Sequence, residues 1–386
     1  MIKIMPKSSY RNMVLKIVNK IIVFCCLFLA LISCKANDRF SKDTESLALF
    51  FGLLQQGRVV DSGQVKCYDT NVGSGIPCND ATYPRQDADY INVPKPRSVS
   101  SPIRINHSIT GESSLVTFDY GTGLVWTSCL MTGYGVADST DGCANSGIPP
   151  VGEVTDLSTA TSYCEGLNTK SYGNRRNWRL PSIRELRTLV VTQPPSPYYD
   201  TTAFPGTVNV LVWSSTPTTS GSSVYYVDFS DGSIYNSTAN YVRCVSGPPL
   251  QSGRFMSLTD GIEKDTATGL MFTRCAAGQN ESADCAGSPN TENWADALKY
   301  CNDLSKEGYS WRLPGIHELE ILLGNSGSID KDHFPNAGAG QYWTSTSYTG
   351  SAMNALVISF DPTASRYGNT GKSGVPPPTV RCVAGP

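Results

Sequence analysis

The stretch Trp178-Arg-Leu-Pro-Ser-Ile-Arg-Glu-Leu186 is the most informative part of this sequence, because it returns almost unchanged as Trp311-Arg-Leu-Pro-Gly-Ile-His-Glu-Leu319. The start of the motif, Trp178–Leu180, is predicted to be a short strand that Pro181 ends. A proline also suits the first turn of a helix, and the apolar residues of Ser182–Val190 recur every three to four positions. Each copy therefore predicts a strand followed directly by a helix whose apolar face points into a core.

The repetition extends well beyond this motif. Further blocks recur in the same order, as expected for tandem domains: Asp119–Cys129 with Asp265–Cys275, Tyr163–Leu167 with Tyr300–Leu304, Val212–Thr216 with Tyr342–Thr346, Tyr226–Phe229 with Val357–Phe360, and Val-Arg-Cys-Val at Val242–Val245 and Val380–Val383. We therefore expect two domains, at residues 112–247 and 254–386. The linker between them is Gly247–Gly253, which is rich in glycine and proline.

The pattern within one copy predicts an α+β domain. A helix is expected at Ser158–Leu167 in addition to the one after the tryptophan motif, and the predicted strands are Gly123–Thr127, Val210–Ser214, Val224–Phe229 and Tyr241–Val245. The dipeptide Asp231-Gly232 between apolar runs indicates a hairpin. Helices that precede a run of strands favour α+β over a parallel α/β arrangement.

The N-terminal residues are typical of an exported lipoprotein. Five basic and no acidic residues precede an apolar run from Ile21 to Ile32, and Cys34 follows Ser33. This pattern resembles the lipobox of bacterial lipoproteins, so residues 1–33 are predicted to be a signal peptide and Cys34 to be lipidated. We expect an exported protein that is lipid-anchored to the cell envelope, at the outer membrane and exposed on the surface or in the periplasm. A soluble secreted protein cut near Ser33 is the alternative.

Residues 34–111 form a lead segment before the first repeat. Its apolar residues predict a short helix within Asp43–Gln56, and Cys67 and Cys78 bracket a turn. Residues 80–100 are rich in proline and charge, so a tether is predicted there.

Composition excludes several classes of function. The net charge of −2 changes to −7 without residues 1–33, because five of the 31 Lys and Arg residues are lost and all 33 acids remain. Nucleic acid is therefore not an expected partner. With only three histidines, a multi-histidine metal centre is not expected, and no cofactor motif is present.

The 13 cysteines can be assigned without a spare thiol. Two lie in the predicted signal peptide, one is Cys34, and ten remain in an exported chain, where disulfides are expected. Four cysteines in each repeat allow three connectivities. We favour local closure for the near pair and a helix pinned to the last strand for the far pair, which gives Cys67–Cys78, Cys129–Cys143, Cys164–Cys244, Cys275–Cys285 and Cys301–Cys382.

Both repeats resemble the Lcl C-terminal domain family, known from the end of a collagen-like adhesin. The resemblance rests on Gly-Leu-x-Trp, Trp-Arg-Leu-Pro-x-x-x-Glu-Leu, Trp-x-Ser-Thr and the closing Val-Arg-Cys-Val. It implies a C-type-lectin-like fold, in which a first helix is disulfide-bonded to the last strand, and a role in adhesion or ligand binding, in that adhesin toward sulfated polysaccharides. This chain departs from the precedent because it has no collagen-like tract and its mature charge is acidic. It also lacks the triplets of calcium-dependent sugar-binding lectins.

Most of the repeated aromatic residues are predicted to be structural. The tryptophans of the Trp-Arg-Leu-Pro motif, together with Trp213 and Trp343, are expected in cores, with Arg179 and Arg312 paired to Glu185 and Glu318 or to main-chain carbonyls. The candidates for ligand contact combine rigid rings with polar tips and nearby carboxylates: Tyr198, Tyr199, Asp200, Tyr225, Tyr226 and Asp228.

These observations favour a lipid-anchored envelope protein with two lectin-like adhesion domains that bind a glycan or an extracellular protein. The alternative is a structural or protein-interaction lipoprotein of the periplasm or outer membrane that binds no glycan. A hydrolase is the weakest of the three hypotheses, because no catalytic motif is present and every mature cysteine has a predicted partner. We therefore expect no enzymatic activity.

Overall fold

A computed structural model of the protein describes residues 59, 62–70, 75–92, 99, 103–106, 113–132, 135–136, 143, 154, 156–191, 198–205, 211–218, 223–230, 232, 234–235, 241–250, 255–259, 261–281, 284–323, 329–338, 340–348, 350–361 and 367–385. The predicted signal peptide, Cys34 and the helix predicted within Asp43–Gln56 lie outside these residues. None of the described helices is long and apolar enough to cross a membrane.

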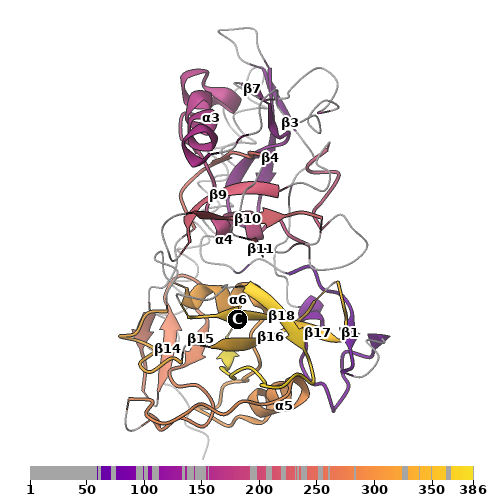
Figure 1. The fold of residues 1–386 in the computed structure, drawn as a ribbon, viewed down its shortest axis with the longest axis vertical. Coiled ribbons are helices and arrows are strands. Elements are labelled where there is room, and N and C mark those ends of the chain that lie inside the picture. The colour runs from indigo at the N-terminus through magenta and orange to yellow at the C-terminus, as the bar shows by residue number, and fades with distance from the viewer. Residues whose placement is uncertain are drawn as a thin grey trace, which may run out of the picture. The chain divides into compact units, whose positions relative to one another are not determined.

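The first repeat is built on two antiparallel sheets and two α-helices (Figure 1). One sheet has the strand order β3 (Ile103–Asn106), β4 (Ser113–Asp119), β5 (Leu124–Thr127), β12 (Val245–Ser246) and β8 (Trp178–Arg179). The other has the order β11 (Ile234–Tyr235), β10 (Val224–Asp228) and β9 (Leu211–Pro217). The helices are α3 (Leu157–Thr169), η2 (Tyr172–Asn174) and α4 (Ile183–Arg187), and a small hairpin is formed by β6 (Met131–Thr132) and β7 (Gly135–Val136).

The second repeat has the same order of elements. Its first sheet has the order β13 (Phe255–Ser257), β14 (Ile262–Asp265), β15 (Met271–Thr273) and β19 (Val383–Ala384), and its second has β16 (Gln341–Ser347), β17 (Asn354–Ser359) and β18 (Tyr367–Gly371). Its helices are α5 (Trp294–Asp303), α6 (Ile316–Leu319) and η4 (Glu320–Leu322). The chain therefore consists of two tandem domains, mostly of β-sheet with few helices.

The tryptophan motif forms the predicted strand and helix in the first repeat, whereas in the second it forms the helix α6 and a single β-bridge from Arg312 to Val383. Arg179 binds Glu185 with two hydrogen bonds, of 2.7 and 2.6 Å, and Arg312 binds Glu318 in the same bidentate way. In the first repeat Ser182 and Glu185 also cap α4 reciprocally, with bonds of 3.2 and 2.8 Å between side chain and backbone. The helix is shorter than predicted, because regular α-helix ends at Arg187 and only turns follow.

The closing Val-Arg-Cys-Val brings the end of each repeat into the middle of its sheet. Val245 pairs with Trp126 on one side and with Arg179 on the other. Arg243 is fully buried, and it donates to the carbonyl oxygens of Thr127 and Ser128. The second repeat repeats this arrangement, since Arg381 donates to the carbonyl oxygens of the equivalent Thr273 and Arg274.

Each repeat has two large hydrophobic clusters, in which the repeated tryptophans lie, and the first repeat has a third, small cluster around the Cys129–Cys143 disulfide. Trp126, Trp178, Trp311 and Trp343 are all at most 2 % exposed, and Trp213 is 5 % exposed. Their indole nitrogens reach main-chain oxygens where a bond is observed, as in the 3.0 Å bond from Trp213 to Val154. The prediction that these tryptophans are core residues is confirmed.

The ten cysteines of the described chain form five disulfides: Cys67–Cys78, Cys129–Cys143, Cys164–Cys244, Cys275–Cys285 and Cys301–Cys382. This is the predicted pairing. Cys164 lies on α3 and Cys301 on α5, so the far pair ties a helix to the closing segment in both repeats.

The lead segment differs from its prediction. It contains β1 (Cys67–Tyr68), β2 (Gly75–Ile76) and the 3₁₀-helix η1 (Asp87–Asn92). Gln86, Asp87 and Ala88 fall in the predicted tether, yet each is at most 5 % exposed. The tether prediction is wrong for these residues, because proline and charge indicated solvent exposure. Gln86 instead bonds the backbone of Tyr68 and Tyr83, and Asp87 accepts a hydrogen bond from Thr346 of the second repeat.

A buried ion pair links the two repeats at equivalent positions of the repeated motif. Arg187 follows Leu186, as Glu320 follows Leu319, and Arg187 Nε lies 3.0 Å from Glu320 Oε1. Both side chains are at most 3 % exposed, and His317 Nδ1 lies 3.0 Å from the other carboxylate oxygen. Burial alone raises the pKa of Glu320, but Arg187 and His317 outweigh it, so the net shift is downward and the pair remains charged.

Candidate functional site

The tyrosines predicted to contact a ligand are buried. Tyr198, Tyr199, Tyr225 and Tyr226 are between 3 and 8 % exposed, and they lie in the two cores of the first repeat. Burial also raises the pKa of the Tyr199 phenol. The prediction of tyrosine surface contacts is wrong. Both faces of β10 are covered, which buries Tyr225 and Tyr226 and which alternation along one strand cannot reveal, while Tyr198 and Tyr199 pack into the second core of the repeat.

The two carboxylates predicted beside these rings shape turns. Asp200 is exposed and accepts backbone hydrogen bonds from Thr202 and Ala203, of 2.8 and 3.0 Å. Asp228 accepts from the backbone and the hydroxyl of Ser230 at the end of β10. Both side chains therefore hold local backbone geometry, as Asp residues commonly do in turns.

A different group of polar side chains comes together in the second repeat. Its centre is Glu263 on β14, which is completely buried. The hydroxyl of Ser257 donates to its two oxygens at 3.0 and 2.9 Å, and His333 Nδ1 lies 2.8 Å from Oε2. Arg274 Nε lies 3.6 Å from Oε1. We call Ser257, Glu263, Arg274, Asp284 and His333 the polar cluster.

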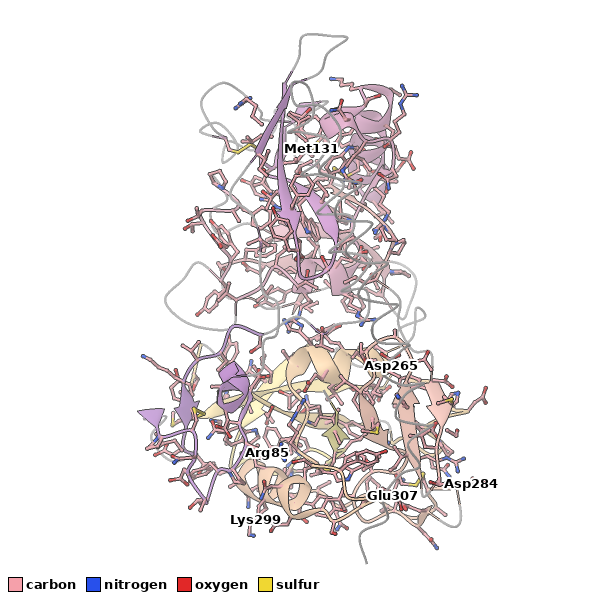
Figure 2. The ribbon with its side chains drawn as sticks, turned by 180° about the vertical axis from the view of Figure 1, so that it is seen from behind. Arg85, Met131, Asp265, Asp284, Lys299 and Glu307 are labelled. Atoms are coloured by element: carbon pink, nitrogen blue, oxygen red, sulfur yellow. A yellow bond between two sulfur atoms is a disulfide. The ribbon has the colours of Figure 1, made fainter. Side chains whose placement is uncertain are left out.

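The outer members of the polar cluster reach the surface. Ser257 is exposed, the side chains of His333 and Arg274 are 26 and 32 % exposed, and that of Asp284 is 77 % exposed. Arg274 Nη2 bonds Asp284 at 3.2 Å (Figure 2 labels Asp284). The buried carboxylate thus orients a hydroxyl, an imidazole and a guanidinium toward solvent, which is a set suited to hydrogen-bonding a polar ligand.

The first repeat has no charged side chains at the positions that correspond to Glu263, Arg274 and His333. The repeated block aligns Glu263 with Thr117 and Arg274 with Ser128, whose hydroxyls share a 2.8 Å hydrogen bond. His333 corresponds to Ala203, because each backbone N–H donates to the aspartate three residues before it, Asp330 and Asp200. Within the described residues, the cluster is therefore specific to the second repeat.

The cluster does not have the geometry of a serine hydrolase. In a catalytic triad the serine hydroxyl bonds one imidazole nitrogen and the carboxylate bonds the other. Here Ser257 Oγ, at 3.5 Å, and Glu263 both face Nδ1 of His333, and the hydroxyl donates directly to the carboxylate. The contacts favour positioning of surface groups over activation of a nucleophile.

Among the described residues, no group of three or more His, Cys, Asp and Glu side chains could hold a metal ion. Asp330 accepts backbone hydrogen bonds from Asp332 and His333, so its carboxylate shapes a turn. The sequence carried one signal for the polar cluster: Arg274 is charged where the first copy of its block has Ser128, and Glu263, two residues before the block, is charged where the first repeat has Thr117.

Comparison with known proteins gives one result. The sequence model described as the Lcl C-terminal domain matches residues 115–246 and residues 261–384. No curated protein and no solved structure matches the chain. The two matched segments correspond to the two repeats and cover more than half of the sequence.

The cluster can be exchanged for its first-repeat counterparts as a test of its packing. We expect Arg274→Ser alone to cost about 1–3 kcal/mol of unfolding free energy, because it removes the cation facing buried Glu263. The triple variant Glu263→Thr, Arg274→Ser, His333→Ala is expected to cost less than the sum of the three single variants, because it restores the hydroxyl pair seen in the first repeat. Urea denaturation measures both effects, and strictly additive losses would contradict the correspondence of the two sites.

Proposed function

Because the chain belongs to the Lcl C-terminal domain family through both of its repeats, we propose that it is a lipid-anchored envelope protein that binds an extracellular ligand. The family is one of adhesin-like extracellular domains, and this chain carries two of them. The proposal further assigns lipidation to Cys34, a C-type-lectin-like fold to each repeat, and a glycan or extracellular protein as the ligand.

The disulfides support export. Five bridges in one chain are typical of proteins that fold in an oxidising compartment. The basic and apolar N-terminus followed by Cys34 supplies the route and the anchor. The bond between a helix and the closing segment in both repeats supports the lectin-like assignment.

The observation that carries the binding role is the polar cluster of the second repeat. Both repeats share the same scaffold. At the positions of the polar cluster the first repeat has the neutral hydroxyls of Thr117 and Ser128, whereas the second has charged groups that reach the surface beside buried Glu263. Packing alone does not require this difference, since the first repeat folds around hydroxyls. The aromatic ring of Phe255 lies 5.8 Å from the His333 ring and adds an apolar surface beside the polar groups.

The chemistry of the cluster favours a polar ligand of low net charge. Its two carboxylates, Glu263 and Asp284, face one guanidinium, so the site itself has no excess of positive charge when His333 is neutral. Together with the acidic mature chain, this disfavours the sulfated polysaccharides implied by the collagen-like adhesin. Hydroxyl groups of a neutral glycan, or polar groups of a matrix protein, match the available donors and acceptors.

Binding is tested directly with the purified mature protein. On an array of glycans and matrix proteins we expect saturable binding to at least one neutral glycan or protein, and a loss of about tenfold or more for His333→Ala, the loss expected when a bound polar group loses its partner. Lys299→Ala is the control, because this exposed residue pairs with Asp303 on the same helix and belongs to neither the polar cluster nor its surroundings in sequence (Figure 2 labels Lys299). An absence of saturable binding across the array would refute the binding role.

Surface exposure is tested by protease shaving of intact cells. We expect cleavage within the repeats without cell lysis, and mass analysis of the N-terminal peptide showing acyl chains on Cys34. Full protection in intact cells, with cleavage only after permeabilisation, would instead indicate a periplasmic lipoprotein that contacts other envelope proteins. An unmodified Cys34 would exclude the lipid anchor.

A further inference from the structure

The described residues 62–70 and 75–92, which we call the strap, are far in sequence from the second repeat but are packed against it, since η1 contacts β16. The contacts begin at the end of β16. Gln64 Nε2 donates to the carbonyl oxygen of Ser347 at 3.2 Å, and the backbone N–H of Ser347 donates back to Gln64 Oε1 at 3.1 Å. One amide side chain thus satisfies both backbone groups of the last residue of the strand, as a neighbouring strand would.

The next contact joins η1 to the same strand end. Thr346 Oγ1 donates to Asp87 Oδ2 at 2.7 Å, and it also accepts the backbone N–H of Ile316 at 3.0 Å. Asp87 is 5 % exposed. It fits because Gly315 has no side chain, since a Cβ there would lie 2.9 Å from Asp87 Oδ1.

A third group of contacts fixes the middle of the strap. Arg85 Nη1 donates to the Ser310 hydroxyl at 2.7 Å and to the carbonyl oxygen of Trp311 at 2.8 Å (Figure 2 labels Arg85). Lys372 Nζ donates to the carbonyl oxygen of Asp69 at 3.3 Å and lies 3.9 Å from the centre of the Trp294 ring. Hydrogen bonds with an ionised donor are stronger than those between neutral groups.

In the first repeat, none of the described residues forms a corresponding strap over the same strand end. Ser215 and Pro217 are exposed there, whereas their counterparts Ser345 and Ser347 are at most 1 % exposed. Thr216 Oγ1 accepts from the helix N–H of Ile183 at 2.9 Å, as Thr346 does in the second repeat. The bond between the strand end and the helix N–H is therefore common to both repeats, and the strap covers this strand end in the second repeat.

One substitution explains why the strap packs against the second repeat and not against the first. The second repeat has Gly315 where the first has Ser182. The carboxylate of Asp87 fits beside Gly315 in the second repeat, whereas in the first repeat a carboxylate at the same place would clash with the side chain of Ser182. We propose that the end of β16 and the turn before α6 form a peptide-docking groove, and that the strap is its resident ligand. The chemical class of ligand is an extended peptide that presents a glutamine amide to the strand end and a carboxylate to Thr346.

This groove lies outside the polar cluster, so the proposal stands apart from the proposed function. It makes the strap and the second repeat one folding unit, with the first repeat placed between its two parts in sequence. It also predicts that docking is reversible without loss of the repeat, because the first repeat folds with its corresponding strand end exposed.

Thr216 of the first repeat, the counterpart of Thr346, provides a matched control for this proposal. Thr346→Val and Thr216→Val each remove the acceptor of one helix N–H, but only Thr346→Val removes a strap contact. In hydrogen exchange, we expect the residue 80–92 backbone to exchange about tenfold or more faster in Thr346→Val, with trypsin cleavage after Arg85, and no change in Thr216→Val. Equal effects of the two variants on the strap, or none from either, would overturn the proposal.

Gly315→Ser gives a second variant that preserves folding, because Ser182 holds this position in the first repeat. We expect it to release the strap to the same extent as Thr346→Val. Ser182→Gly is its control and is expected to leave strap exchange unchanged. A strap that stays protected in Gly315→Ser would contradict the role of the glycine.

The groove is then probed as a binding site. The strap is weakened in the full chain by Gln64→Ala with Asp87→Ala, and a synthetic peptide of residues 62–92, closed by its disulfide, is added. We expect saturable binding of one peptide per chain, renewed protection of β16, and at least tenfold weaker binding of the same peptide carrying Asp87→Ala. Equal affinity of the two peptides, or no saturable binding, would show that the groove does not recognise this chemistry.

Discussion

The structure of each repeat depends on the return of its closing segment, Val242–Val245 or Val380–Val383, into the centre of a sheet. This segment pairs with strands from both the beginning and the middle of the repeat. Its arginine is buried, and such a charge is costly unless its hydrogen bonds are satisfied. Two carbonyl oxygens and an aromatic ring, Phe204 or Phe334, meet the guanidinium in each copy. The cysteine beside it then links the closing segment to a helix, across sequence separations of 80 and 81 residues, where loop closure stabilises most.

This common framework could be predicted from sequence because its signals are local and occur twice. The strand and helix of the tryptophan motif follow from proline placement and apolar spacing. The disulfides follow from an even number of cysteines at matching places in the two copies. Both partners considered for Arg179 are found, since it binds Glu185 bidentately and also donates to the main-chain carbonyl of Gly247 at 3.4 Å.

The functional surface could not be predicted in the same way. The tyrosines of β10 have the side chains expected of a binding surface, but a second layer covers them, and burial of that kind depends on residues distant in sequence. Glu263 and His333 come together across 70 positions, and Asp87 and Thr346 across 259. What the sequence did hold is the contrast between copies, since Arg274 and Gly315 depart from blocks that otherwise repeat. In this chain, differences between the repeats locate the candidate sites better than residue type does.

The central claim is that a shared scaffold carries a ligand site in the second repeat only. The most direct test compares ligand binding by the wild-type chain with that of the triple variant Glu263→Thr, Arg274→Ser, His333→Ala, which gives the second repeat the side chains of the first. Isothermal titration with the ligand found on the array is expected to show binding by the wild type and none by the folded triple variant. Unchanged affinity in the triple variant would contradict the account, because binding would then reside in the scaffold or elsewhere in the chain.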